Sequence, residues 1–310
     1  MSLTRKQSAW VKPHQRLKRS AFFNNKCVIL SNFNHWLVGI IDGDGTFYFA
    51  KNKNGSWTFS FQISQSMCNL RLLYFIKSKL KVGSIYMDRK NSIATYRIRN
   101  RTHIIKYIIP IFDTHKLLTN KYYKYYFFKK AILIANNAKL TGTEKNLLVS
   151  DLKLKSTQLP KNFISPAWID VLPQLKYKID AEKIMKKAWL IGFTEAEGSF
   201  YITKKDQKRL VHGFEITQKL NTIVLTAIAL IFNLKVTKKK THFSVVTTNS
   251  KRIKNIINYF FKTMKGMKSL EFKIWAKSFN KKKRGFEYLL KIRNLMRNIR
   301  SIKLTKTNKK

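Results

Sequence analysis

The pattern of apolar and polar positions runs through the same series of elements twice. In each half of the chain it predicts a helix, two strands, a second helix, two more strands and two further helices. The strand at 56–65 shows the clearest alternation, with apolar residues such as Trp57 and Phe59 separated by polar ones. One face of this strand should be buried and the other polar. The predicted fold class is therefore α+β, with two units of similar build.

The repeat extends to the residues themselves. WLVGIIDGDGTFYF, which begins at Trp36, and WLIGFTEAEGSFYI, which begins at Trp189, place Asp44 over Glu197 at a separation of 153 positions. The same separation relates two later strands that end in FQISQ and FEITQ. Self-similarity at a fixed separation indicates a duplicated structural unit. We expect the two motifs to form equivalent helices in the two halves.

Changes in composition divide the chain into five segments. They are a basic N-terminal extension at 1–30, a first unit at 31–137, a linker at 138–187, a second unit at 188–280, and a basic helix and tail at 281–310. The linker is polar, holds three of the five prolines, and is expected to contain one or two short helices. Apolar positions around Leu289 have helical spacing, so the C-terminal helix should pack on the second unit, whereas the last residues have the composition of a disordered tail.

The charge of the chain indicates its partner. The 63 Lys and Arg residues outnumber the 15 Asp and Glu residues, which gives a formal net charge of +48. A field of this strength favours a polyanion, with nucleic acid as the first candidate and an anionic membrane surface as the alternative. The longest apolar run, at 223–232, is too short to span a bilayer. The N-terminal residues lack the apolar stretch of a secretory signal.

Residue usage bears on the compartment. Only two cysteines are present, which argues against a disulfide framework and favours a reducing environment. Lys, Asn, Ile, Phe and Tyr are abundant, whereas Gly and Pro are scarce. This bias is typical of an AT-rich genome. It favours an organellar protein, mitochondrial rather than chloroplast.

Small residues mark one face of each motif helix. Gly39 and Gly43 are four positions apart in the first copy, and Gly192 and Ala196 are four apart in the second. Residues at this spacing lie on the same side of a helix and allow two backbones to approach closely. The two motif helices are therefore predicted to pack on each other through these four residues.

An acidic residue followed by glycine ends each motif helix. Glycine after Asp44 and after Glu197 predicts a left-handed cap, which places both acids at helix C-termini. A carboxylate there is disfavoured by about 0.3 to 1 kcal/mol, and two packed helix ends would also bring the two carboxylates into mutual repulsion. Divalent cations that bridge the carboxylates to a phosphate explain this arrangement, and hard oxygen ligands suit Mg²⁺. The predicted chemistry is phosphodiester hydrolysis.

The doubled motif resembles the LAGLIDADG signature of homing endonucleases, in the single-chain form that carries two copies. The resemblance covers about residues 34–279. It implies two αββαββα units related by a pseudo-twofold axis, with two antiparallel sheets that form a saddle on double-stranded DNA. It also implies metal-dependent cleavage of both strands. Because one chain carries both motifs, a monomer is expected.

The resemblance assigns roles to particular residues. It implies metal ligands at Asp44 and Glu197 with the adjacent Gly43 and Ala196, polar catalytic residues at Gln65 and Gln218, and active-site lysines at Lys121 and Lys268. Asp42 and Glu195 occupy an earlier acidic position, which is mainly structural in the family. Asn69 and Thr222 stand four positions after the two glutamines, where the family has a basic residue. This departure bears on the catalytic rate.

The polar faces of the strands are the predicted DNA-binding surface. Gln62 suits adenine, and its counterpart Glu215 is suited to accept a hydrogen bond from cytosine, each worth about 1 to 3 kcal/mol of discrimination. Other residues expected on this surface are Tyr48, Ser60, Ser64, Ser84, Tyr86, Arg97, Arg99, Tyr201, Thr203, Lys205, Lys238 and Lys240. Most of the basic residues are expected to contact phosphate rather than bases.

Three functions compete at this point. The first is a site-specific, Mg²⁺-dependent DNA endonuclease that cuts a long asymmetric target in intron homing. The second is an RNA maturase that assists splicing of its own intron, with or without nuclease activity, and so has intron RNA as a partner. The third, a basic structural protein such as a ribosomal component, has no need of a doubled acidic motif. Two intact acids favour the endonuclease.

Overall fold

The computed structural model describes residues 30–282 and 285–301. Residues 1–29 of the predicted N-terminal extension and residues 302–310, in the predicted tail, lie outside the described ranges. None of the helices in the described ranges combines the length and hydrophobicity needed to cross a bilayer.

The first unit contains the predicted series of elements. A helix at 30–44 leads into β1 (Gly45–Lys51), β2 (Trp57–Ser66), η1 (Met67–Asn69), α2 (Leu70–Leu80), β3 (Ser84–Asp88), β4 (Ile93–Ile98), α3 (Arg101–His103), η2 (Ile104–Ile108), α4 (Ile109–Thr114) and α5 (Lys121–Ala135). The strands form one antiparallel sheet in the order β1-β2-β4-β3.

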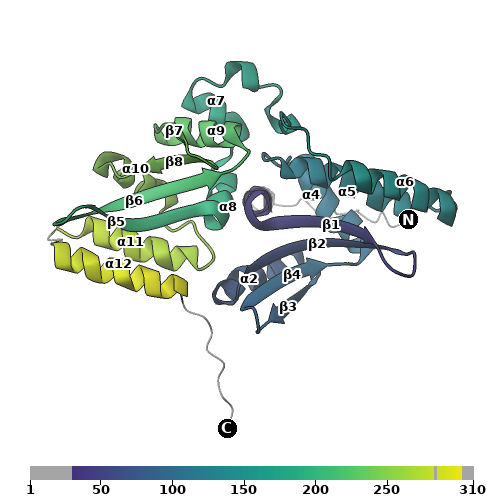
Figure 1. Ribbon diagram of the computed structural model, residues 1–310, viewed down its shortest axis with the longest axis horizontal. Helices are drawn as coiled ribbons and strands as arrows, with labels where there is room; N and C mark the ends of the chain where they lie inside the picture. Colours follow the sequence, from purple (N-terminus) through teal and green to yellow (C-terminus); the bar gives the residue numbers. More distant parts are fainter. Residues whose placement is uncertain (1–29, 283–284, 302–310) are drawn as a thin grey trace, which may run out of the picture.

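The second unit repeats this series. It comprises α8 (Lys187–Glu197), β5 (Gly198–Asp206), β6 (Arg209–Gln218), α9 (Thr222–Phe232), β7 (Val236–Lys238), β8 (Phe243–Thr247), α10 (Ser250–Phe260) and α11 (Lys268–Asn280). Its antiparallel sheet has the equivalent order, β5-β6-β8-β7. The two units lie side by side with α8 at the junction between the sheets (Figure 1). The α+β class with two pseudo-symmetric units is thereby confirmed.

Each unit has an aromatic core at an equivalent position. Phe47 on β1 lies 5.1 Å from the ring of Tyr125 on α5, measured between centroids. Its counterpart Phe200 on β5 lies 5.0 Å from the ring of Trp275 on α11. Alternate residues of β1, β2, β5 and β6 enter these cores, which lie between the sheets and their helices. The helices therefore cover one face of each sheet and leave the other face for a ligand.

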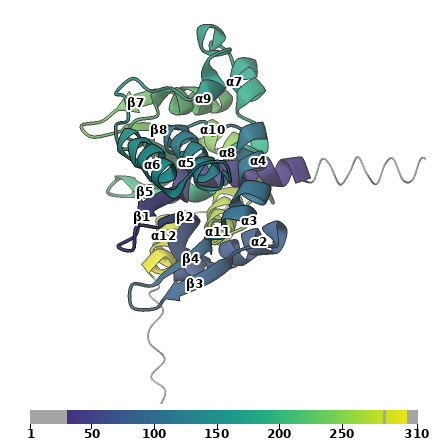
Figure 2. The ribbon, with the colours of Figure 1, turned by 90° about the vertical axis from the view of Figure 1, so that its right-hand side faces the viewer.

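The predicted linker holds more helical structure than expected. Its elements are α6 (Gly142–Lys155), η3 (Pro166–Trp168), η4 (Leu172–Gln174) and α7 (Lys178–Ile184). The 14-residue α6 runs beside α5, and both face the viewer in Figure 2. Thr141 and Glu144 cap its N-terminus reciprocally, a pattern that the spacing of these two residues in the sequence already contains. Trp57 donates a 2.9 Å hydrogen bond to Asn146, which attaches α6 to β2.

The C-terminal helix packs as predicted. α12 (Phe286–Ser301) lies against α11, β5 and β6 and buries Leu289 and Met296. Arg300 donates a 2.6 Å hydrogen bond to the carbonyl of Phe200, where β5 begins. This helix therefore supports the second motif from the side opposite the linker (Figure 1).

The glycines that follow the motif helices are not left-handed caps. Gly198 has an extended conformation, with φ −77° and ψ 150°, and Gly45 is the first residue of β1. The strand begins at once and passes close over the last helical turn. A Cβ atom at Gly198 would lie 2.5 Å from the side chain of Thr194, and one at Gly45 would lie 2.8 Å from the Cα of Ile41. Close approach, not a positive φ, requires glycine here.

Candidate active site

The two motif helices meet through small residues. All four that the sequence marked lie at this contact: Gly39, Gly43, Gly192 and Ala196. A Cβ atom at Gly39 would overlap the main-chain carbonyl of Trp189, and one at Gly192 would overlap that of Trp36. The contact is therefore reciprocal. It brings the C-terminal ends of both helices to one point between the sheets.

A buried carboxylate on the first motif helix organises the loop before α5. Asp42 is 2% exposed and accepts hydrogen bonds from the backbone nitrogens of Leu118, at 2.8 Å, and Thr119, at 3.0 Å. The Thr119 hydroxyl also donates to it, at 2.6 Å, and so does Trp189 of the other motif helix, at 2.8 Å. Burial raises the pKa of Asp42, and these hydrogen bonds oppose that shift. Asp42 thus holds both its own unit's loop and the opposite helix.

Glu195 repeats this arrangement in the second unit. It accepts hydrogen bonds from the backbone nitrogens of Lys265, at 2.6 Å, and Gly266, at 2.9 Å, and from the indole of Trp36, at 3.3 Å. Burial raises its pKa, again against the accepted hydrogen bonds. Glu195 and Asp42 act as structural residues, because their carboxylate oxygens accept hydrogen bonds from these donors.

The second acid of each motif lies at the meeting point of the helices. Asp44 accepts a 2.5 Å hydrogen bond from Gln65, and the side chain of Gln218 is hydrogen-bonded to Glu197. A Cβ atom at Gly43 would lie 3.3 Å from the Cγ of Glu197. Burial raises the pKa of both acids, and the charge of Asp44 raises that of Glu197 further. The two carboxylates therefore share one centre built from both units.

A lysine lies beside this centre in each unit. Lys121, the first residue of α5, donates to the carbonyls of Ile41, at 3.1 Å, and Gly43. Lys268, the first residue of α11, donates to the carbonyl of Gly198 at 2.8 Å. Burial lowers the pKa of both lysines, and nearby carboxylates act in the opposite direction. The lysines occupy equivalent places but hold different parts of the helix ends.

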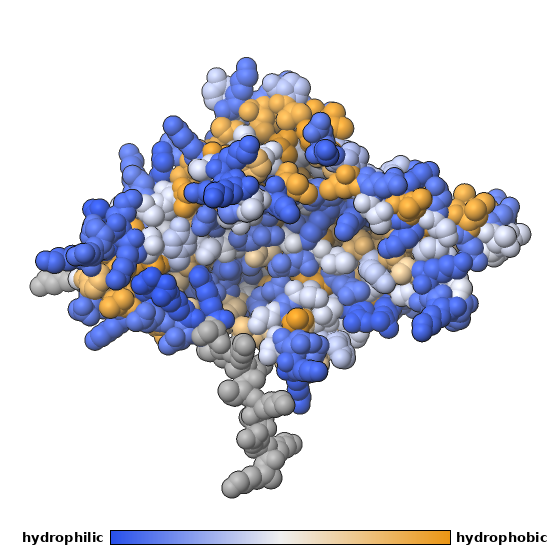
Figure 3. Space-filling model, viewed as in Figure 1, coloured by the Kyte–Doolittle hydropathy of each residue, from blue (hydrophilic) through white to orange (hydrophobic). Residues whose placement is uncertain are grey.

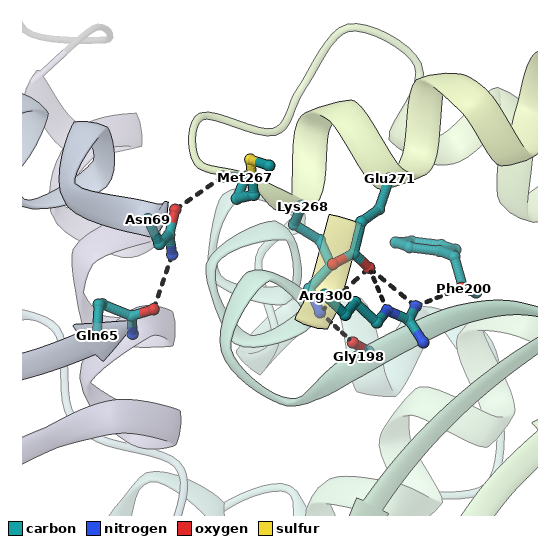
Figure 4. Close-up of polar contacts among 8 residues, drawn as sticks. All are labelled: Gln65, Asn69, Gly198, Phe200, Met267, Lys268, Glu271 and Arg300. Atoms are coloured by element: carbon teal, nitrogen blue, oxygen red, sulfur yellow. Dashed lines mark hydrogen bonds and ion pairs between the residues drawn. The ribbon is translucent and has the colours of Figure 1, made fainter. Parts of the chain in front are cut away.

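A further carboxylate distinguishes the second lysine from the first. Glu271 is buried one turn along α11, with an oxygen 3.9 Å from the Lys268 ammonium. Arg300 binds the same oxygen at 2.9 Å, as Figure 4 shows. The C-terminal helix is thus connected to the environment of Lys268.

Two asparagines complete the setting of the glutamines. Asn69 donates to Gln65 at 2.7 Å, and Asn221 donates to Gln218 at 2.9 Å. Sequence reasoning missed Asn221 because it stands three positions after its glutamine rather than four. The repeat therefore pairs Asn69 with Thr222. A comparison that allows a shift of one residue would have found it.

A cavity opens beside the acid pair. Its volume is about 820 Å³, and it is lined by Asp44 and Tyr48 together with Lys121, Lys124 and Lys153. A cavity with one carboxylate and three lysines is suited to a phosphate with a bound cation.

Hydrophilic residues dominate the face of the molecule in Figure 3, and apolar residues gather near the top of the view, over α7 and α9.

The donor set fits a hard divalent cation. Mg²⁺ is usually held by one or two carboxylates, with water and substrate phosphate oxygens as its other ligands. Asp44 and Glu197 supply two carboxylates, and no cluster of three or more His, Cys, Asp or Glu residues occurs within 30–282 and 285–301. The carbonyl of Gly43, a residue predicted to lie among the metal ligands, accepts a hydrogen bond from Lys121. Ala196, the other small residue, faces Gly43 with its Cβ.

Strand pairing places the predicted DNA-facing residues of the first unit on one face. One row crosses the sheet through Thr46, Gln62, Arg97 and Ser84, and the next contains Ser64, Thr95 and Tyr86. Arg99 follows the end of β4 and is exposed. Tyr48 is 45% exposed, but its partner Ser60 is only 1% exposed. The expectation that Ser60 is accessible is wrong, because this side chain is buried although it shares the face of Gln62 and Ser64.

The outer face of the second sheet is formed mainly by β5 and β6. Its predicted residues lie along β5 and β6: Glu215 pairs with Ser199 and Val246, Tyr201 pairs with Gly213, Thr203 pairs with Val211, and Lys205 lies at an irregularity in the pairing. The Tyr201 ring covers Gly213, where a Cβ atom would collide with it.

The expectation that Lys238 and Lys240 lie on the outer face of the sheet needs correction. Lys238 pairs with Phe243, which in turn pairs with Gln218 on β6. Gln218 and Glu215 are three residues apart on this strand, so their side chains point to opposite faces of the sheet. Lys238 therefore has the parity of the core face, and Thr237 takes the outer face. Lys240 is exposed in the turn after β7, outside the sheet. The error arose because strand pairing, which the sequence does not show, fixes the face of a three-residue strand.

Two polar sheet faces beside a shared centre of two carboxylates and two lysines, in a chain with a net charge of +48, define a nuclease built from two similar units. Comparison with known proteins agrees. The chain matches the LAGLIDADG endonuclease family over residues 37–132 and 190–279, and it belongs to that family. The two segments lie one in each unit, which confirms the resemblance drawn from the doubled motif.

Individual relatives extend this finding. The chain is 40% identical over 302 residues to the probable intron-encoded endonuclease Cox1-I1b of Schizosaccharomyces pombe, covering 93% of this chain and 74% of that protein. It is 30% identical to the uncharacterized mitochondrial protein RF1 of Saccharomyces cerevisiae, covering 72% of this chain but only 46% of that one. Among solved structures it is similar to I-SmaMI bound to an uncleaved DNA target in the presence of calcium ions, with 26% identity, a TM-score of 0.70, and coverage of 86% and 98%.

Proposed function

We propose that this chain is a site-specific, Mg²⁺-dependent DNA endonuclease that cuts both strands of a long asymmetric target and thereby mobilises the intron that encodes it. The observation that carries the proposal is the meeting of Asp44 and Glu197 at the ends of the paired motif helices. Burial and mutual repulsion disfavour two ionised carboxylates there. A divalent cation and a phosphate would offset both costs.

The residues of the centre divide the work. The bound cation would supply Lewis-acid activation of the scissile phosphate. Asp44 and Glu197 would hold that cation, and Gln65 orients Asp44 through its 2.5 Å hydrogen bond. Lys121 and Lys268 place positive charge where negative charge develops on the phosphate, which stabilises a transition state more than a ground state.

The sheets would bind the DNA. Their outer faces carry polar rows that include Gln62 and Glu215, and the field of a chain with charge +48 attracts phosphates from both strands. Arg97 lies 5.9 Å from the ring of Tyr86, so its guanidinium is held on this face. The two sheets carry different residues at equivalent positions, which favours an asymmetric target.

One chain supplies both motif helices, so the active form is proposed to be a monomer of 36.6 kDa. The expected compartment is the mitochondrion. The names of two relatives support it, since one is called intron-encoded Cox1-I1b and the other a mitochondrial protein.

Incubation of the purified protein with a library of long DNA duplexes and Mg²⁺, followed by sequencing of the new ends, tests the proposal. We expect ends on both strands at one family of sites, and none in EDTA. Asp44→Asn protein is the matched negative control. A library left intact in both Mg²⁺ and Mn²⁺ would overturn the assignment, and cutting that persists in EDTA would overturn its metal dependence.

A further inference from the structure

A chain of three hydrogen bonds runs from the second unit into the acid of the first. The backbone nitrogen of Met267 donates to Asn69 at 2.7 Å, Asn69 donates to Gln65 at 2.7 Å, and Gln65 donates to Asp44 at 2.5 Å. Met267 directly precedes the active-site lysine Lys268. Figure 4 shows the first two of these bonds, which extend from Gln65 on β2 through Asn69 on η1 to the residue before α11 in the other unit.

The direction of these bonds is fixed at both ends. A backbone N–H can only donate, and an ionised carboxylate can only accept. Each amide side chain between them must therefore turn its oxygen toward the preceding donor and its NH₂ group toward the next acceptor. A single orientation of Asn69 and Gln65 satisfies the whole chain, so the position of the loop in one unit determines which group of the glutamine faces the acid of the other.

An equivalent chain runs the opposite way. The backbone nitrogen of Asn120 donates to Asn221 at 2.8 Å, and Asn221 donates to Gln218 at 2.9 Å. The Gln218 side chain is hydrogen-bonded to Glu197, which completes the path to the second acid. Asn120 directly precedes the other active-site lysine. The two chains are thus related by the pseudo-twofold relation of the units, although Asn69 and Asn221 are not equivalent in the sequence repeat.

Both donor loops are themselves anchored. Glu195 holds the backbone of Lys265 and Gly266, just before Met267, and Asp42 holds the loop before Asn120. A loop held this firmly gives the asparagine a fixed point of reference. The glutamine beside each acid is therefore aligned against the rigid part of the opposite unit, not only against its own strand.

We infer that Asn69 and Asn221 are positioning residues, each of which aligns the glutamine beside one acid with the lysine-bearing loop of the other unit, so that each half of the active site is complete only when both units are in place. This inference rests on the proposed endonuclease function. It assigns neither asparagine a contact with DNA or with the cation. Their effect on cleavage passes through Gln65 and Gln218.

The kinetic test compares the two strands of a DNA target selected with the wild-type protein. Single-turnover cleavage of duplex labelled on either strand is measured for Asn69→Ala and Asn221→Ala. Misplacement of catalytic groups by such changes costs about 10- to 100-fold in rate. We expect each variant to slow cleavage of one strand by about this factor, and the two variants to affect opposite strands. Both should accumulate nicked DNA, and their DNA dissociation constants in EDTA should stay within about twofold of wild type.

Two further variants separate positioning from packing. Asn69→Asp keeps an oxygen for the Met267 nitrogen but removes the donor to Gln65. It should therefore retain the wild-type melting temperature and be slow in cleaving the same strand as Asn69→Ala. Thr222→Ala alters the position that the repeat pairs with Asn69, at the start of α9, and should cleave both strands at wild-type rates.

The side-chain amide signals of the glutamines provide a test that needs no cleavage. In ¹H–¹⁵N spectra, Asn69→Ala should shift the NH₂ signals of Gln65 and leave those of Gln218 in place, and Asn221→Ala should do the reverse. Unchanged Gln65 signals in Asn69→Ala, or variants that slow both strands equally, overturn the inference. A wild-type protein that cuts no DNA while the amide shifts occur as expected refutes the endonuclease and leaves the positioning role supported.

Discussion

One methyl group added at the helix contact tests whether the approach of the two motif helices maintains the site. In Gly39→Ala the new Cβ atom would lie 2.8 Å from the backbone nitrogen of Phe193, and in Gly192→Ala it would lie 3.0 Å from that of Ile40. Both obstacles are main-chain atoms within helices. They cannot rotate away as the end of a flexible side chain would.

The size of the effect follows from these distances. The carbonyl oxygens of Trp189 and Trp36 are nearer still to the two new Cβ atoms. Because ordinary contacts of carbon begin at about 3.5 Å, the helices must separate by about an ångström. Overpacking of this kind costs about 1 to 3 kcal/mol, which corresponds to a fall in melting temperature of about 2 to 12 °C. Asp44 and Glu197 lie at the ends of the separated helices, so cleavage should fall by about 10- to 100-fold.

Differential scanning calorimetry and single-turnover cleavage measure the two effects. Gly142→Ala is the matched control, because a Cβ atom there meets nothing within 4 Å. We expect it to melt and cleave like the wild type. If Gly39→Ala and Gly192→Ala also matched the control in both assays, the helices would not be held by this contact, and the geometry given for the acid pair would be incorrect.

Three other predictions concern the acids, the cation and pH. Asp44→Asn and Glu197→Gln should each abolish double-strand cleavage and leave DNA affinity, measured by fluorescence anisotropy, near wild type, because phosphate contacts are retained; full cutting by either variant would exclude its acid from the site. Mg²⁺ added to the EDTA-treated protein–DNA complex should restore cleavage and raise the melting temperature. If Mg²⁺ leaves the melting temperature of Asp44→Asn unchanged, the increase in the wild type is due to the acid pair. His115 lies 4.2 Å from the ring of His35, and burial, followed by the charge of His35, lowers its pKa below 6.5. The folded state therefore favours the neutral form of His115. The contribution of this neutral histidine to stability is complete above pH 6.5 and is lost as pH falls through the lowered pKa. His115→Gln should flatten this part of the dependence of melting temperature on pH; an identical slope would locate the titration elsewhere.

The fold could be predicted because the sequence repeats its own information. Alternation in β2, small residues on the motif helices and the 153-residue separation each indicate the same two units. Local patterns of this kind decide which elements form and which face is buried. The acids and their lysines followed from the family resemblance, and the structure brings Asp44, Glu197, Lys121 and Lys268 to one centre.

Long-range geometry accounts for what the sequence could not predict. The face of Lys238 depends on its pairing with Phe243, and the burial of Ser60 on a polar face of β2 departs from the alternation of that strand. Asn221 was missed because a hydrogen bond can be satisfied from adjacent positions of a turn, so equivalent bonds need not come from equivalent residues. The glycine after each acid was assigned to a left-handed cap because sequence alone does not show that the strand turns back across its helix.

The exchange of indole donors between the motif helices limits how the halves of this enzyme can be recombined. Asp42 depends on Trp189 and Glu195 depends on Trp36, so each half carries one member of two separate buried pairs. A half transplanted into another two-unit nuclease would leave its indole without an acceptor, at about 1 to 3 kcal/mol, and its carboxylate without one of several donors, unless the recipient matched both. The sheet faces take no part in these pairs. With DNA read by the sheet faces as proposed, new specificities can evolve strand by strand, whereas a functional chimera needs matching tryptophan and acid at the junction.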